Sequence, residues 1–193
     1  KFIDVRGVTY QPEGDGVMAP TYAQQHLPVR EQRTAEGHSV RAMYLYSGMA
    51  DIVASKGDTT LIPALESIWH DIVDKKMHIN GGLGAVPGIE GFGPAYVLPN
   101  RDTYDETCAA VGNVLFNYRM FLASRDAKYV DVAEVALYNN VLAGVKETDS
   151  STSMYWKPTE RKPSTMVVQD VPLGLVPPVV HRIWHASSHK YRE

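Results

Sequence analysis

The sequence predicts a mainly α-helical fold built from helical hairpins, with a small β element near the C-terminus. Apolar residues recur with spacings of three and four in four separate stretches, and these stretches form pairs joined by short polar turns. Composition agrees with a folded domain, because 44% of the 193 residues are hydrophobic and 21% are charged. A chain of this length can bury a sizeable core.

The first predicted hairpin joins two amphipathic stretches across the turn "SKGD". From Val40 the apolar residues follow a helical stripe that ends at this turn. After it, an i, i+3, i+4, i+7 pattern comprises Leu61, Ala64, Leu65, Ile68, Trp69, Ile72 and Val73. We expect Asp58 or Thr59 to cap this second helix, and Pro63 lies early enough to be tolerated in its first turn.

The second predicted hairpin repeats this outline. One helical stripe runs from Val111 to Leu122 and ends at "SRDAKY", and its partner runs from Val132 to Val141. Because both hairpins have short polar turns, we expect the helix pairs to stack side by side. After Gly144 the helical pattern fades, and "TSMYW" and "TMVVQDV" predict short strands.

The segment between the hairpins is a candidate functional loop. "MHINGGLGAVPGIEGFGPAYVLPNRD" is rich in glycine and proline and is too long for a simple connector. Loops of this kind are usually functional or disordered, and its aromatic residues and Glu90 argue against disorder. Taken alone, a glutamate in such a loop is more often a solvated side chain than a catalytic one.

Cys108 is the only cysteine of the chain and follows Glu106 by two residues. Side chains at i and i+2 do not share a helix face, so this pair can converge only in the turn that opens a helix. A thiol there would have its pKa lowered by the helix N-terminus. The alternative for Cys108 is a small core residue, and the alternative for His38 is a capping or packed histidine.

Charge and hydropathy exclude several classes of partner. The net charge is −3 and no basic stripe with interleaved aromatics is present, so we expect no nucleic-acid partner. No apolar run reaches the roughly 18 to 20 residues that cross a bilayer, so we expect no membrane span. The opening stretch "KFIDVRGVTY" lacks the features of a signal peptide, which favours a cytoplasmic location, but a single cysteine does not distinguish a reducing compartment from an oxidising one.

Four separate motifs occur in the order "HLPVREQRTAEGHSVRAMYLYSGMAD", "MHINGGLGAVPGIEGFGPAYVLPN", "YDETCAAVGN" and "DAKYVDVAEVALYNNVLAGV". In this order and spacing they resemble glycoside hydrolase family 127, the β-L-arabinofuranosidases. The resemblance implies a partial (α/α)6 barrel, the six-hairpin glycosidase fold. It also implies that residues 1–193 form a single, partial catalytic domain, in which residues from about 150 to 193 are a divergent stretch.

The resemblance implies a catalytic residue and a metal site. Glu90 would be the general acid/base, and Glu106 and Cys108 would supply two zinc ligands. The implied reaction is retaining hydrolysis of terminal arabinofuranosyl groups, in which a zinc-bound cysteine thiolate replaces the usual carboxylate nucleophile. The expected cofactor is therefore zinc.

The resemblance also implies a carbohydrate partner, an L-arabinofuranoside. His38 in the "GHSVRAMYL" stretch would contact the sugar, and Glu134, which lies two positions before "ALYN", would lie near it. Tyr155 is the expected match for an aromatic residue that lines the pocket.

The sequence departs from the family pattern at the expected nucleophile. The family has two adjacent cysteines there, whereas "GLVPPVVHRIW" has Leu175 and Val176, which can neither bind zinc nor attack an anomeric carbon. Three explanations stay open: a variant that binds sugar without cleaving it, a site completed by another residue such as His181 or His185, or a sequence misread or frame-shifted after about Ser150. We favour the third, because the upstream site residues persist.

The number of predicted helices implies an incomplete barrel. A full barrel of six hairpins needs roughly twice the helices found here. We therefore expect the C-terminal half of a barrel, whose apolar helix faces need cover. The expected partner is the missing half of the barrel or a second copy of this chain in a homodimer.

Overall fold

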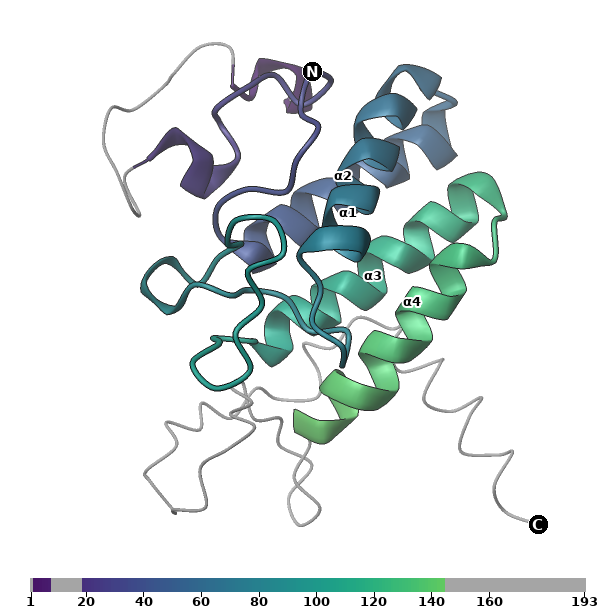
Figure 1. Ribbon diagram of the computed structural model, residues 1–193. Helices are drawn as coiled ribbons and strands as arrows, with labels where there is room; N and C mark the ends of the chain where they lie inside the picture. The colour runs from purple at the N-terminus through teal and green to yellow at the C-terminus, as the bar shows by residue number, and fades with distance from the viewer. Residues whose placement is uncertain (1, 8–18, 145–193) are drawn as a thin grey trace, which may run out of the picture.

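The computed structural model describes residues 2–7 and 19–144, in which four α-helices pack together and a long irregular loop gathers near one end (Figure 1). The helices are α1 (Ser39–Lys56), α2 (Ile62–Lys75), α3 (Thr107–Ser124) and α4 (Lys128–Ala136). Short 3-10 turns lie at Ile3–Val5, Pro20–Ala23, Thr59–Leu61, Pro87–Ile89 and Leu142–Gly144, and a π-helical turn at Leu137–Val141. The mainly helical prediction is confirmed.

Both predicted hairpins form, and their ends follow from local chemistry. α1 ends at Gly57 (φ +67°) and α3 ends at Arg125 (φ +64°), both in the left-handed conformation that commonly terminates helices. Pro63 lies in the first turn of α2, as predicted. Asp58 caps the 3-10 turn ahead of α2, because its carboxylate accepts from the Thr60 backbone N–H at 3.2 Å.

The predicted β element lies outside the described residues, together with Tyr155, Leu175 and Val176. Within residues 2–7 and 19–144, β-type pairing is limited to two isolated bridges, which join Gly91 to His38 and to Val86. None of the helices in this same part of the chain is long and apolar enough to span a membrane.

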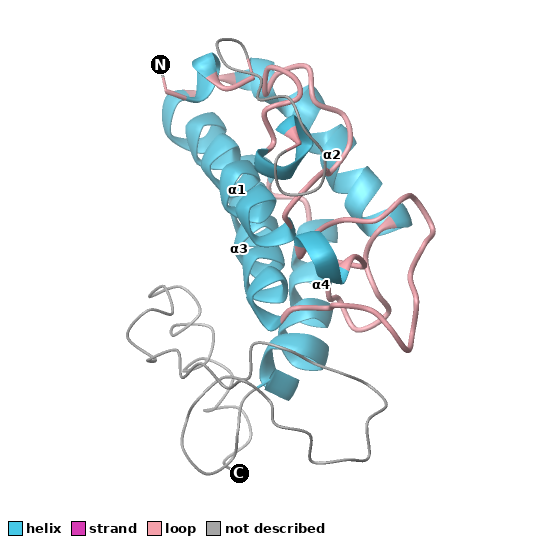
Figure 2. Ribbon diagram, turned by 90° about the vertical axis from the view of Figure 1, so that its left-hand side faces the viewer, coloured by secondary structure: helices cyan, strands magenta, loops and turns pink. Residues whose placement is uncertain are grey.

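α3 is the central helix and packs along both α1 and α4 (Figure 2). Gly112 marks the closest approach to α1, since a Cβ atom there would lie 2.6 Å from Met43 Cβ. One turn further along, the rings of Tyr46 and Phe116 pack with their centroids 5.9 Å apart in the core. Because α1 and α3 fit this closely, the residues at their N-terminal ends are held at fixed positions relative to each other.

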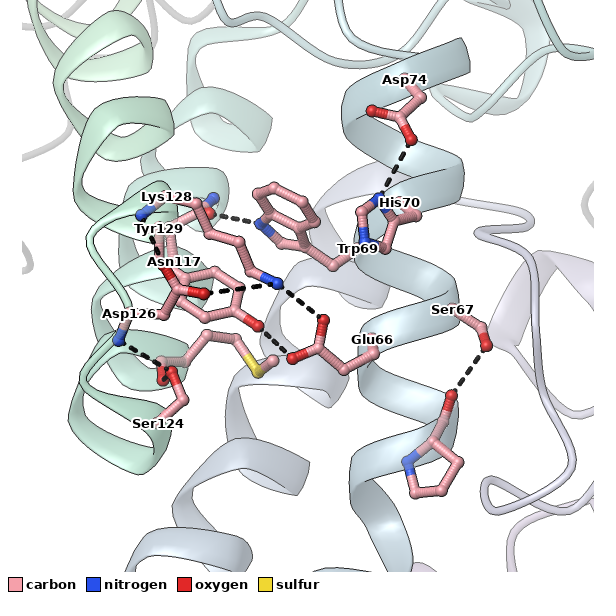
Figure 3. Close-up of polar contacts among 12 residues, drawn as sticks. Glu66, Ser67, Trp69, His70, Asp74, Asn117, Ser124, Asp126, Lys128 and Tyr129 are labelled. Carbon is pink, nitrogen blue, oxygen red and sulfur yellow. Dashed lines mark hydrogen bonds and ion pairs between the residues drawn. The ribbon is translucent and has the colours of Figure 1, made fainter.

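Polar contacts join α2 to the second hairpin (Figure 3). The buried Trp69 Nε1 donates to Asn117 Oδ1 at 2.7 Å. Closer to the surface, the Lys128 ammonium lies 5.0 Å from the Trp69 ring centroid and 3.1 Å from a Glu66 carboxylate oxygen. The Tyr129 hydroxyl donates to the other oxygen of Glu66. These contacts fix the separation between α2 and α4.

A buried ion pair attaches the segment before α1 to α2. Asp71 Oδ2 lies 2.9 Å from Lys76 Nζ, and both side chains are about 5% exposed or less. The same Asp71 oxygen accepts from the Ala35 backbone N–H at 2.9 Å, and Lys76 Nζ donates to the Ala35 C=O at 2.8 Å. The pair therefore satisfies both backbone groups of Ala35 and sets the path of the chain into α1.

Replacing Asp71 by alanine should lower the free energy of unfolding by about 3 to 5 kcal/mol, because Lys76 would stay buried without its closest counter-charge. Asp74→Ala is the matched control on the same helix. Asp74 is exposed, and its one ion pair within residues 2–7 and 19–144 is with exposed His70, so its loss should cost less than about 1 kcal/mol. Urea unfolding followed by circular dichroism measures both values, and equal costs would contradict the role of the buried pair.

Candidate functional site

Backbone pairing brings His38 and Glu90 together from distant parts of the sequence. The Ser39 backbone N–H and hydroxyl both donate to the Glu90 C=O, at 3.0 and 2.9 Å. The Phe92 N–H donates to the Gly37 C=O at 2.9 Å. His38 Nε2 then lies 3.2 Å from Glu90 Oε2, with the His38 side chain 12% exposed and the Glu90 side chain 44% exposed. The carboxyl group thus contacts the imidazole and remains open to solvent.

This pairing depends on glycine and on a strained glutamate. A Cβ atom on Gly91 would lie 2.4 Å from the Gly37 carbonyl oxygen, so only glycine allows the two backbones to approach. Glu90 itself adopts the left-handed conformation, with φ 51° and ψ 40°. That conformation costs a non-glycine residue about 1 to 2 kcal/mol, and such strain concentrates at functional sites.

Tyr22 and Arg41 complete the surroundings of His38. The Tyr22 ring meets the His38 ring edge-on with centroids 5.6 Å apart, and the Arg41 guanidinium carbon lies 5.0 Å from the Tyr22 ring centroid. Burial lowers the pKa of His38, although the nearby Glu90 carboxylate opposes this effect. His38 is therefore a neutral imidazole at pH 7. No sequence pattern indicated Tyr22 or Arg41, because single aromatic and cationic residues are common in any chain.

Glu106 and Cys108 converge at the start of α3, where their spacing requires them to be. Glu106 directly precedes the first turn, and its carboxyl group and the Cys108 thiol lie close enough for each to shift the pKa of the other, after the larger effect of burial on both. Glu106 is buried, and its Oε2 atom has no hydrogen-bond partner among the described residues. Burial is the main cause that raises the pKa of both groups, and the charge of Glu90 adds a smaller increase to each.

The expected lowering of the Cys108 pKa is wrong. Burial raises the pKa of the Cys108 thiol to about 12, and the Glu106 carboxylate adds to this effect. Burial likewise raises the pKa of Glu106 to about 7. Desolvation and a neighbouring negative charge thus outweigh the helix dipole on which the expectation relied. A cation bound between the two groups would favour their charged forms instead.

Glu106 and Cys108 supply two donors of the types found in zinc sites, and the unpartnered Glu106 Oε2 is available for a ligand. Zinc sites in proteins use three or four protein ligands. Within residues 2–7 and 19–144, no group of three or more His, Cys, Asp or Glu side chains could hold a metal ion. The pair therefore fits half of a zinc site.

The described part of the chain does not test the other two predicted sugar-contacting residues. Glu134 is exposed on α4, and no contact joins it to His38 or Glu90 in the described part of the chain. Tyr155 lies outside the described residues. Their roles in sugar binding stay predictions.

Asp105, which the sequence analysis missed, lies directly before the Glu106 and Cys108 pair. It is buried, and its carboxylate accepts hydrogen bonds from Asn80 Nδ2 at 2.8 Å and Asn140 Nδ2 at 3.0 Å. Two sequence features could have indicated the buried site of Asp105: the adjacent asparagines at 139 and 140, and the "NGG" turn at 80–82. Neither follows a periodic pattern that would predict burial.

Comparison with known proteins identifies related chains. Residues 1–173 match the family described as Beta-L-arabinofuranosidase, GH127 catalytic domain. Over 130 residues the chain is 39% identical to a non-reducing end β-L-arabinofuranosidase from Bifidobacterium longum subsp. longum. The aligned region covers 67% of this chain and 20% of that protein.

Solved structures give the same result. The GH127 β-arabinofuranosidase BT3674 matches 87% of this chain with 46% identity and a TM-score of 0.75. Ara127N-Se, a GH127 β-L-arabinofuranosidase from Geobacillus stearothermophilus T6, matches 81% with 36% identity and a TM-score of 0.74. This chain covers 26% of each of these two chains.

Alkylation of Cys108 should be slow at pH 8 in chelator-treated protein, because its raised pKa leaves on the order of a thousandfold less thiolate than an ordinary cysteine has. Glu106→Gln removes the adjacent negative charge and should increase the rate at pH 9. Exposed Glu31 provides the control, and Glu31→Gln should not change the rate. Iodoacetamide labelling followed by mass spectrometry measures the rates, and a Glu106→Gln rate at or below the unsubstituted rate would contradict the charge effect.

Stability should depend on pH through Glu106. Because its pKa rises from 4.5 to about 7 on folding, its favourable contribution is present below pH 4.5 and is lost as the pH rises through 7. Glu106→Gln mimics the protonated acid, so it should raise the free energy of unfolding at pH 8 by up to about 3 kcal/mol and leave it unchanged at pH 4. Urea unfolding at both pH values tests this, and an equal offset at both would exclude a titrating Glu106.

Proposed function

Since the chain belongs to the β-L-arabinofuranosidase GH127 catalytic-domain family, we propose that it provides the acid/base and sugar-contacting part of a site that hydrolyses terminal β-L-arabinofuranosyl groups. The observation that carries this proposal is the His38 and Glu90 pair, 3.2 Å apart on a backbone that holds Glu90 in a strained conformation. The chain spans about a fifth of the length of the curated relative, so the complete activity is part of the proposal.

Glu90 acts as the general acid/base. A retaining glycosidase needs one carboxyl group that first protonates the departing glycosidic oxygen and later removes a proton from water. Glu90 suits both steps, because its side chain reaches solvent while its backbone carbonyl is held by two hydrogen bonds from Ser39. Neutral His38 donates from Nε2 to Glu90 Oε2, which leaves Oε1 as the oxygen that exchanges a proton with the substrate.

Glu106 and Cys108 would hold a zinc ion together with ligands that the described residues do not include. When bound, zinc would supply a positive charge that keeps a coordinated thiol deprotonated near neutral pH. The convergence of the two side chains and the unpartnered Glu106 Oε2 support this role. From the family resemblance we expect the nucleophile in the stretch that has Leu175 and Val176 instead of cysteines, so we assign no residue to that step.

The second candidate function is sugar binding without hydrolysis. It is favoured by Leu175 and Val176, because neither side chain can act as a nucleophile or a metal ligand. In this case His38, Glu90 and Tyr155 would hold the sugar. The third explanation, a frame-shifted sequence after about Ser150, is tested by re-reading the coding DNA for residues 145–193; two cysteine codons at positions 175 and 176 would support the hydrolase.

Glu90→Gln should lower the hydrolysis rate of an alkyl β-L-arabinofuranoside by about 10²- to 10⁴-fold, because the poor leaving group needs a proton from Glu90. A p-nitrophenyl arabinofuranoside should be cleaved with a smaller loss, and the affinity measured by calorimetry should change little. Asp102→Asn, in an exposed part of the same loop, is the control and should retain both rates.

Equal rates for Glu90→Gln and the unsubstituted protein on the alkyl substrate would remove Glu90 from the mechanism. Saturable binding of the arabinofuranoside with no hydrolysis by the unsubstituted protein would support the second candidate function instead.

A further inference from the structure

Asp105 joins three segments that lie far apart in the sequence. Its Oδ2 atom accepts from Asn80 in the glycine-rich loop, and its Oδ1 atom accepts from Asn140 in the π-helical turn after α4. Its own backbone N–H donates to the Gly84 C=O at 2.9 Å. Both carboxylate oxygens therefore face amide groups in the protein interior, directly beside the Glu106 and Cys108 pair.

The loop segment is built closely around this carboxylate. A Cβ atom on Gly82 would lie 1.6 Å from Asp105 Oδ1, so no other residue fits at position 82 without moving Asp105. Asn80 Oδ1 accepts from the Gly82 N–H at 3.0 Å, which fixes the orientation of the Asn80 amide. Between these two residues, the Gly81 C=O accepts from Asn113 Nδ2 at 3.1 Å, which ties the turn to α3.

Asn140 reaches Asp105 because the chain leaves α-helical geometry after α4. Residues Leu137–Val141 form a π-helical turn, and such insertions occur frequently at functional sites. Asn140 is fully buried there. Its Nδ2 donates to Asp105, whereas its Oδ1 has no hydrogen-bond partner among the described residues. The turn thus directs an amide at the carboxylate and leaves one of its polar atoms unpaired.

Stability alone is a poor explanation for this arrangement. Burying a carboxylate is costly, and packed apolar residues of similar size often serve stability better. Asp105 also adopts a left-handed conformation, with φ 38°, which L-residues rarely adopt. Glu106, the next residue, is extended, with φ −76° and ψ 131°. This change of direction at Asp105 determines where Glu106 and Cys108 point as α3 begins.

We propose that Asp105 is a positioning residue, which together with Asn80 and Asn140 fixes the turn that brings the Glu106 carboxyl and the Cys108 thiol to one point. The use of that point as a metal half-site rests on the proposed function, whereas the geometry of the turn does not. Asp105 acts through the direction of its hydrogen bonds and binds neither the metal nor the sugar.

The three residues offer variants that separate geometry from charge. Asp105→Ala removes both hydrogen bonds, and Asn140→Ala removes one. Asp105→Asn keeps the shape and tolerates a left-handed conformation. Its amide oxygen would accept from Asn80, and its amide NH2 would donate to Asn140 once that side chain flips to present its unpaired Oδ1. The Asp105→Asn variant should therefore keep the two hydrogen bonds that Asp105→Ala loses.

Two measurements on the 193-residue chain report on the pair. The first is the rate at which iodoacetamide alkylates Cys108 at pH 8 in the presence of a chelator, which needs no metal. The second is titration with Co²⁺, which gives a charge-transfer absorption when a thiolate coordinates it. Asp105→Ala and Asn140→Ala should alkylate faster and bind Co²⁺ about tenfold more weakly, whereas Asp105→Asn should match the unsubstituted chain.

Asn117→Ala is the matched structural control. It removes a buried amide that bonds to Trp69 on α2 and to Asn113, one turn earlier on α3, so it should lower the melting temperature to a similar extent. It should leave both Cys108 readouts unchanged. If Asp105→Ala does not fold, the comparison of Asn140→Ala with Asn117→Ala carries the test.

Two results would overturn the inference. The first is that Asn117→Ala changes the alkylation rate and the Co²⁺ affinity as much as Asn140→Ala does. The second is that Asp105→Asn changes them as much as Asp105→Ala does. If the unsubstituted chain gives no Co²⁺ signal, the metal part of the proposed function fails, and the alkylation rates still decide the role of Asp105.

Discussion

The approach of the backbone at Gly37 to the backbone at Gly91 is the constraint on which the candidate site depends. It allows the Ser39 N–H to donate to the Glu90 C=O and the Phe92 N–H to donate to the Gly37 C=O, and these bonds fix both the start of α1 and the middle of the long loop. Closing the segment between residues 37 and 91 costs conformational entropy, and these hydrogen bonds help to offset that cost. The position of Glu90 follows from it.

The N-terminal ends of α1 and α3 both open onto this loop. His38 precedes α1, Glu106 precedes α3, and the loop between them brings Gly84 close to both Ser39 and Asp105. Each helix therefore directs the positive end of its dipole toward a region rich in carboxylates. The packing of α1 on α3 is what keeps the two helix starts close together, so the fold as well as the loop determines the site.

Periodicity predicted the helices well because burial of one face leaves a repeating pattern. The stripe from Leu61 to Val73 and the turn at Gly57 lie where the structure has α2 and the end of α1. Motif resemblance supplied the roles of Glu90 and His38, and the structure adds their 3.2 Å contact. The left-handed conformation of Glu90, the buried Asp105 and the π-helical turn had no sequence pattern, because each depends on contacts between distant segments. The Cys108 pKa was misjudged for a related reason: sequence indicates a helix start but not how deeply a side chain is buried.

The half-buried thiol of Cys108 also affects how the chain responds to oxidants. Peroxides react with the thiolate form of cysteine, so a thiol whose pKa is raised to about 12 is oxidised slowly. As the chain has no second cysteine, it cannot form an internal disulfide either. The same burial that makes Cys108 a poor nucleophile without a cation therefore preserves its sulfur in the reduced state during exposure to air.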